Sequence, residues 1–183
     1  MGFGHDAFEE QVAGLRHVGL DTNACIYLLT RHEPLMEPVR RLLERANARQ
    51  LAISISRLVQ MELLIHPLRH RDLREREVII DLTERSVGVE VTDLSRTVMF
   101  LAAEIRAHTR LKAPDAIVVA SAAASGCQAI VGNDKRFRDI EALGGARFLG
   151  MGSRPVAMPA YLHLDDFVGR APQPVTTRRR LKR

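Results

Sequence analysis

Residues 18–29, VGLDTNACIYLL, place the carboxylate Asp21 between a short apolar run and a mostly apolar segment with helical spacing. The run at residues 17–21 is typical of a short buried strand, and the segment after it is typical of a helix. In open parallel sheets, ligands bind at the carboxyl ends of the strands. Asp21 is therefore predicted to lie at a ligand-binding edge. The alternative is that its carboxylate only caps the helix.

The same order of strand and helix recurs along the chain. Further strands are predicted at residues 51–55, 87–91 and 128–132, with an edge strand at 161–167. Helices are predicted at residues 37–49, 68–85 and 93–109, from about Pro114 to a cap at Gly126, and in a short segment from about Asn133. This alternation predicts an α/β fold in which helices cover a parallel sheet.

Length and composition predict one globular domain with modest tails. The chain has 183 residues, of which 46% are apolar and 27% charged. No run approaches the roughly 20 apolar residues of a membrane helix, and the acidic N-terminus lacks a secretory signal. Cys25 and Cys127 show neither a disulfide framework nor a zinc-site spacing. We expect a cytoplasmic protein with reduced thiols and no membrane partner.

The net charge of +5 comes entirely from the C-terminal end. The last eight residues, TTRRRLKR, carry five positive charges and no negative charge, among them Arg178, Arg179 and Arg180. Such a segment is typical of a flexible arm that attracts phosphate backbones. The alternative is a solvated end without a partner. Lys135 and Arg136 are further candidates for RNA contact, with surface solvation as their alternative.

Three more acidic residues stand at positions that a simple fold does not require. Glu62 lies on a largely apolar helix face, where it needs a cation, a hydrogen-bond network or a proton; Arg57 and His66 are candidate partners. Asp115 is in the first turn of the helix that begins near Pro114, and Asp134 follows the strand at 128–132. Each alone has a structural explanation, but four acids at one predicted edge favour a shared site.

Four neighbouring carboxylates require a cation to stay ionised together. Carboxylate oxygens suit the hard ions Mg²⁺ and Mn²⁺. Such ions orient and deprotonate water for in-line attack on phosphorus and stabilise the leaving oxygen. The acids Asp21, Glu62, Asp115 and Asp134 are therefore predicted to bind metal and to catalyse phosphodiester hydrolysis, with Asn23 and Asn133 orienting them.

Four segments together resemble the PIN-domain family, and most closely the bacterial VapC-type toxins of toxin–antitoxin pairs. They are VGLDTNACIYLL, SRLVQMELL, LKAPDAIVVASAAASG and AIVGNDKRF, within residues 17–168. The resemblance implies a three-layer α/β/α fold with about five parallel strands, and a Mg²⁺- or Mn²⁺-dependent endoribonuclease. It assigns the four acids to the metal site and Asn23 to a supporting amide, and it implies a homodimer with a cognate antitoxin.

The sequence departs from the family pattern at three places. Gly132 stands where Thr or Ser often precedes Asn-Asp, so a hydroxyl near the metal is missing, and Asn133 is expected to compensate. The chain is also longer than the usual toxin at both ends. We therefore predict an N-terminal extension at residues 1–16, a PIN-like domain at 17–168 and a basic tail at 169–183.

Two other functions are consistent with parts of the sequence. A non-catalytic, regulatory RNA-binding PIN domain would explain the missing hydroxyl and the basic tail. A phosphatase acting through an aspartyl intermediate usually has Asp-x-Asp after its first strand, whereas this chain has Asp21-Thr22-Asn23. Nucleotide-binding folds are disfavoured because the chain has neither GxGxxG nor GxxxxGK. RNA cleavage is the preferred hypothesis.

Overall fold

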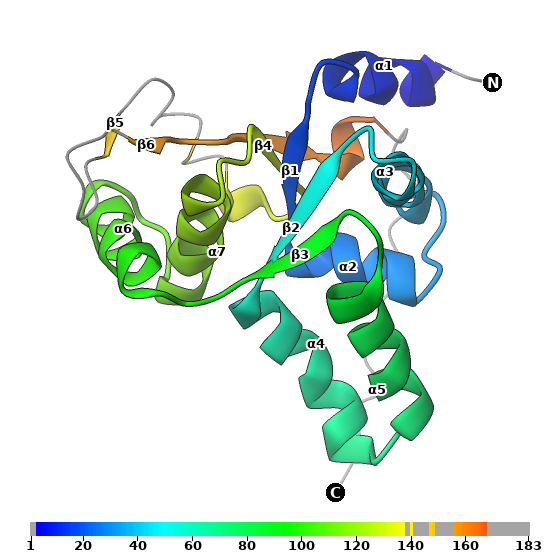
Figure 1. The fold of residues 1–183 in the computed structure, drawn as a ribbon. Helices are drawn as coiled ribbons and strands as arrows, with labels where there is room; N and C mark the ends of the chain where they lie inside the picture. The colour runs from blue at the N-terminus through cyan, green and yellow to red at the C-terminus, as the bar shows by residue number, and fades with distance from the viewer. Residues whose placement is uncertain (1–2, 138–139, 141–146, 149–155, 168–183) are drawn as a thin grey trace, which may run out of the picture.

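A five-stranded parallel sheet forms the centre of the protein (Figure 1). The structure, a computed structural model, describes residues 3–137, 140, 147–148 and 156–167. The strand order is β3-β2-β1-β4-β7, with all pairs parallel. The strands are β1 (His17–Leu20), β2 (Ala52–Ser56), β3 (Val89–Thr92), β4 (Ala129–Gly132) and β7 (Ala160–His163). The predicted parallel sheet is confirmed, with β7 as an edge strand.

Helices cover both faces of this sheet, which confirms the three-layer fold (Figure 1). The helices α6 (Arg96–His108) and α7 (Ala113–Ala124) lie on one face. The helices α2 (Thr22–Leu29) and α3 (Met36–Asn47) lie on the other. A separate antiparallel pair is formed by β5 (Arg147–Phe148) and β6 (Val156–Ala157).

The core is centred on β1 and its two neighbours. Val18 pairs with Ile53 of β2 and with Ala129 of β4, and all three side chains are buried. A strand that is covered by helices on both faces needs apolar residues at successive positions rather than at alternate ones. This is why HVGL, AISIS and AIVG appear in the sequence as short continuous apolar runs.

The predicted helix at residues 68–85 was wrong as a single unit. Helix α4 (Arg57–His70) ends inside it, because Arg71 adopts a left-handed conformation with φ of 55°. The Asp72 carboxylate then accepts hydrogen bonds from two backbone N–H groups and caps α5 (Leu73–Ile80), which continues into a π-helical turn, η1 (Asp81–Arg85). The short helix predicted from Asn133 is a single 3₁₀ turn, η2 (Lys135–Phe137).

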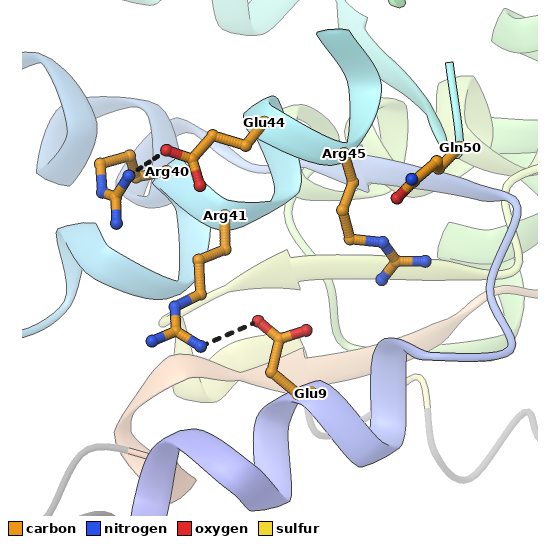
Figure 2. Close-up of a pocket in the computed structure, with 6 residues that line it drawn as sticks. All are labelled: Glu9, Arg40, Arg41, Glu44, Arg45 and Gln50. Carbon is orange, nitrogen blue, oxygen red and sulfur yellow. Dashed lines mark hydrogen bonds and ion pairs between the residues drawn. The ribbon is translucent and has the colours of Figure 1, made fainter. Parts of the chain in front are cut away.

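Residues ahead of β1 form a helix, α1 (Phe3–Val12), that docks on the core. Phe8 and Val12 are buried, and the Phe8 ring packs edge-on against Phe167. Arg45 of α3 donates to the Val12 carbonyl at 2.9 Å, and Arg41 pairs with Glu9 of α1 (Figure 2). The predicted extension at residues 1–16 therefore contributes a helix that packs against α3.

An open pocket of about 570 Å³ lies between α1 and α3. Figure 2 shows the side chains that line it. Its charged side chains pair with one another or with neighbouring groups: Arg40 with Glu37 and Glu44, and Arg45 with backbone carbonyls. A cationic pocket whose arginines already have partners has little charge left to attract a ligand. We assign it to the docking of α1.

Two sequence predictions concern membranes and the tail. Within the residues that the structure describes, no helix is both long enough and apolar enough to cross a bilayer. The basic tail at residues 169–183, including Arg178, Arg179 and Arg180, lies outside the described residues.

Candidate functional site

The topology brings the starts of three helices to the carboxyl edge of the sheet. Helices α2 and α4 follow β1 and β2 directly, so each begins where a strand ends. Helix α7 precedes the parallel strand β4 and runs back along the sheet, so it also begins at this edge (Figure 1). Residues on the first two turns of these helices therefore converge with those that follow β1 and β4.

All four predicted acids line one pocket of about 210 Å³ at this edge. Asp21 follows β1, Glu62 is on α4, Asp115 is in the first turn of α7 and Asp134 follows β4. Asn23 also lines the pocket, whereas Asn133 is not among its lining residues. The remaining lining residues are Thr22, Pro114, Val118, Arg136 and Phe137.

Asp21 both caps α2 and faces the pocket. Its Oδ1 accepts a hydrogen bond from the Ala24 backbone N–H at 2.7 Å, and its Oδ2 accepts one from the Tyr161 hydroxyl at 2.5 Å. Asp21 is 3% exposed, and burial raises the pKa of its carboxyl to about 6, although these hydrogen bonds act in the opposite direction. The two explanations weighed from the sequence, helix cap and site residue, therefore describe two oxygens of one side chain.

Gly132 makes the contact between Tyr161 and Asp21 sterically possible. A Cβ at this position would lie 1.8 Å from Asp21 Oδ2 and 2.3 Å from the Tyr161 hydroxyl oxygen. The Tyr161 hydroxyl also accepts the backbone N–H of Asp134 at 3.1 Å, and its ring stacks on Phe137. The hydroxyl beside Asp21 thus comes from β7, at the position where the fourth motif lacks one.

Asn133 contacts Asp21 through its backbone rather than its side chain. Its backbone N–H donates to the Asp21 carboxyl. Its side-chain amide donates to the Tyr27 hydroxyl at 3.2 Å and accepts from the Asp165 backbone N–H at 3.3 Å. The Asn133 side chain therefore connects β4 to α2 and to the turn after β7.

Glu62 is held by a residue next to Asp21. The Thr22 hydroxyl donates to Glu62 Oε2 at 2.5 Å, which ties α4 to the start of α2. The partners weighed from the sequence are engaged elsewhere: Arg57 pairs with Glu84 and Asp93, and His66 pairs with Glu75. The Glu62 carboxylate therefore points into the pocket without a basic partner from its own helix.

Asp115 has an unsatisfied oxygen. Its Oδ2 is buried and accepts no hydrogen bond from any described residue, although Arg136 Nη1 lies 3.2 Å away. Burial raises the pKa of this carboxyl, and the nearby guanidinium offsets part of the rise. A buried carboxylate oxygen without a hydrogen bond is costly, and the charge of Arg136 offsets only part of this cost.

Asp134 differs from Asp115, because Arg136 contacts both oxygens of its carboxylate. Arg136 Nε lies 3.0 Å from both carboxylate oxygens, and Nη2 also contacts Oδ2. This hydrogen-bonded ion pair lowers the pKa of the Asp134 carboxyl below its usual range. Asp134 is thus ionised with its oxygens covered by the guanidinium, and Lys135 beside it is exposed.

The four carboxylates are the kind of ligand that hard divalent cations prefer, although their side chains are not gathered around one point. In the described part of the chain, no three His, Cys, Asp or Glu side chains are arranged to hold a metal ion. One pocket nevertheless contains four carboxylates and one guanidinium, and Asp115 Oδ2 accepts no hydrogen bond from a described residue. Asp21, Glu62, Asp115 and Asp134 are the residues whose carboxylate oxygens could hold Mg²⁺ or Mn²⁺.

A family profile described as PIN domain matches residues 18–143, which is more than half of the chain. This chain belongs to the PIN-domain family. The match covers all four acids of the pocket and begins at β1, after α1. No curated protein matches the chain.

Solved structures of VapC proteins share this PIN fold. VapBC2 from Rickettsia felis, bound to a DNA fragment from their promoter, superposes with a TM-score of 0.54 and 21% identity over 67% of this chain and 91% of that chain. Mycobacterium tuberculosis VapC20, described as a sarcin-ricin loop cleaving toxin, gives 0.53 and 18% over 66% and 92%. VapBC-1 from nontypeable Haemophilus influenzae gives 0.54 and 15% over 81% and 98%.

Sequence reasoning missed two residues that hold the acids of this pocket, Thr22 and Tyr161, and it noted Gly132 only for its missing hydroxyl. Thr22 stands between Asp21 and Asn23, but nothing local indicates that it would meet a helix that begins 35 residues later. The absent hydroxyl at Gly132 was the available signal for Tyr161, because a glycine next to a carboxylate leaves room for another side chain.

Tyr161→Phe is expected to lower the free energy of unfolding by about 1–3 kcal/mol. The substitution leaves Asp21 Oδ2 and the Asp134 N–H without their common partner. Urea denaturation in EDTA measures the change. Tyr27→Phe is the matched control, since its hydroxyl meets the Asn133 amide at the longer distance of 3.2 Å. Equal losses for the two variants would contradict a special role for Tyr161.

Proposed function

We propose that this PIN-domain protein is a Mg²⁺- or Mn²⁺-dependent endoribonuclease. The observation that carries the proposal is the pocket lined by Asp21, Glu62, Asp115 and Asp134, in which, among the described residues, the buried Asp115 Oδ2 accepts no hydrogen bond and has only the positive charge of Arg136 nearby. Carboxylates at the edge of a parallel sheet, in a pocket that solvent can enter, are suited to divalent-metal chemistry on phosphodiesters.

In this mechanism the four acids are the metal ligands, and neighbouring groups hold them in position. Asp115 and Asp134, which both contact Arg136, would supply oxygens for the metal, and Asp21 and Glu62 would supply further ones. Tyr161 and the Ala24 N–H fix the plane of the Asp21 carboxyl, and Thr22 fixes Glu62. Asn23 supports the ligands. A bound metal ion would activate water and stabilise the leaving oxygen.

RNA recognition in this proposal rests mainly on phosphate contacts. The chain has two Tyr, six Phe and no Trp, which leaves few rings for base stacking. Arg136 lines the pocket, the exposed Lys135 precedes it in the sequence, and Arg178, Arg179 and Arg180 add charge in the tail. Contacts of this kind position RNA without reading its sequence.

The biological setting that we propose is a toxin–antitoxin pair. The fold is shared with VapC20, which is described as cleaving the sarcin-ricin loop, and with VapBC complexes. By analogy, this chain acts in the cytoplasm as a homodimer that a cognate antitoxin inhibits. The alternative is a regulatory PIN domain that binds RNA without cutting it.

RNA cleavage by the purified protein tests the proposal. Labelled structured and single-stranded RNAs are incubated with Mg²⁺, Mn²⁺ or EDTA, using wild type, Asp115→Asn and Asp81→Asn. Asp81 is the matched control, because it pairs with Arg85 on the surface at 2.6 Å. We expect metal-dependent cleavage that Asp115→Asn lowers by at least about 100-fold, because a lost metal ligand costs several kcal/mol of transition-state stabilisation. RNA binding without cleavage would favour the regulatory alternative.

A further inference from the structure

Arg136 connects the two sides of the acidic pocket. Its Nε and Nη2 atoms contact the Asp134 carboxylate, and its Nη1 lies 3.2 Å from Asp115 Oδ2. These two acids come from different elements, the segment after β4 and the first turn of α7. A planar guanidinium presents several N–H donors at once, so a single side chain can face both carboxylates.

We propose that Arg136 is an internal counter-cation that occupies the ligand oxygens of the metal site and must move away when a divalent ion binds. The inference rests on the proposed metal site and adds a control on its affinity. Both oxygens of Asp134 face Arg136, so a metal ion can use this carboxylate fully only after the guanidinium has left.

The backbone around Arg136 allows this movement, since it is anchored by other groups. Phe137 is buried and stacks on Tyr161 with ring centroids 4.6 Å apart. The Asp134 N–H donates to the Tyr161 hydroxyl, and the Arg136 N–H donates to Asp134 Oδ1 at 2.9 Å. None of these contacts uses the guanidinium. The turn η2 therefore keeps its shape when the Arg136 side chain swings out.

The exposure of Arg136 makes the contact easy to displace. Its side chain is 54% exposed, whereas those of Asp115 and Asp134 are 12% and 17% exposed. Ion pairs with a solvent-exposed partner stabilise proteins only weakly, and a divalent ion carries twice the charge. A metal ion can therefore displace the guanidinium from the carboxylate oxygens. The competing positive charge lowers the apparent affinity of the site for the metal. Once displaced, the guanidinium is free to contact an RNA phosphate.

Lys135 provides the matched control for this charge. It is adjacent in sequence and exposed, and it forms no ion pair with a described residue. Lys135→Gln and Arg136→Gln remove the same formal charge one residue apart. Only the second uncovers the oxygens of Asp134. Arg136→Lys keeps the charge but replaces the planar fork with a single ammonium group.

Calorimetric titration of the metal-free full chain with Mn²⁺ tests the proposal. Arg136→Gln is expected to bind Mn²⁺ at least about 10-fold more tightly than wild type, and Lys135→Gln within about 3-fold of wild type. Arg136→Lys is expected to lie between wild type and Arg136→Gln. Equal affinities of the two Gln variants would overturn the proposal. An Arg136→Lys affinity equal to wild type would also overturn it, since charge alone would then explain the effect.

The titration contains no RNA, so its outcome is separate from that of the cleavage assay. Tighter Mn²⁺ binding by Arg136→Gln in a protein that cuts no RNA would support the counter-cation and overturn the nuclease. Metal-dependent cleavage together with equal Mn²⁺ affinities of the two Gln variants would support the nuclease and overturn the counter-cation. No Mn²⁺ binding by any variant would overturn the metal site, and the counter-cation with it.

Discussion

Asp21→Asn is expected to abolish metal-dependent RNA cleavage and, at the same time, to stabilise the metal-free protein by up to about 3 kcal/mol at neutral pH. Burial raises the pKa of the Asp21 carboxyl from 3.8 to about 6, and each pKa unit corresponds to roughly 1.4 kcal/mol. The amide avoids the cost of a buried charge, and its oxygen still accepts the Ala24 N–H that caps α2. Its NH2 group cannot accept the hydrogen bond that Oδ2 accepts from the Tyr161 hydroxyl, which offsets part of this gain.

The raised pKa of Asp21 makes the free energy of unfolding depend on pH. Below about pH 3.8 the carboxyl is protonated in both the folded and the unfolded state, so no stability is lost. Between about pH 3.8 and 6 the unfolded state loses its proton first, and the free energy of unfolding falls as the pH rises. Above about pH 6 the loss is complete. Asp21→Asn lacks this decline.

Urea denaturation in EDTA at several pH values between 4 and 7.5 measures both profiles. Asp81→Asn, a surface substitution, is expected to retain the wild-type decline. Saturating Mg²⁺ is expected to restore stability to wild type but not to Asp21→Asn, because only the native site with its full charge binds the ion tightly. Parallel pH profiles for wild type and Asp21→Asn, or wild-type cleavage by that variant, would contradict the assigned role.

Gly132→Ala is expected to destabilise the protein by on the order of 3 kcal/mol or more. The added Cβ would lie 1.8 Å from Asp21 Oδ2 and 2.3 Å from the Tyr161 hydroxyl oxygen. Both groups are buried and held by hydrogen bonds, so neither can yield without losing a partner. The free energy of unfolding from urea denaturation is the measurement.

Two further variants make the Gly132 result specific. Gly14→Ala is the control, because a Cβ there meets nothing within 4 Å and should change stability by less than about 1 kcal/mol. Combining Gly132→Ala with Tyr161→Phe removes the hydroxyl at 2.3 Å, so the double variant should lose less than the sum of the single losses. Wild-type stability of Gly132→Ala would mean that Asp21 and Tyr161 can separate at little cost.

The sheet and the convergence of the acids were predictable because both depend on local sequence. Short apolar runs mark strands that are buried on two faces, and in parallel topology all strand ends and the following helix starts lie at one edge. Asp21, Asp115 and Asp134 could therefore be placed together from their positions relative to strands and helices. Glu62 could be added because it stands on an apolar helix face without an obvious partner.

Helix boundaries were less predictable where a residue has an unusual backbone conformation. The segment at residues 68–85 alternates charges without a glycine or an internal proline, so nothing in its composition separates α4 from α5. The break depends on Arg71, which takes a left-handed conformation, and on Asp72, which caps α5. An arginine in that conformation is held by the packing of α4 against α5 rather than by its own preference.

The sequence by itself determined the parallel α/β fold and the four acidic residues that meet at its edge, because strand and helix periodicity and chain order carry that information. Only the tertiary structure decided which group contacts each carboxylate: Tyr161, 140 residues away, contacts Asp21, Thr22 contacts Glu62, and Arg136 contacts both Asp115 and Asp134. The physical reason is that hydrogen bonds and ion pairs act over about 3 Å. Contacts at that range depend on side-chain placement across elements, which local sequence patterns do not encode.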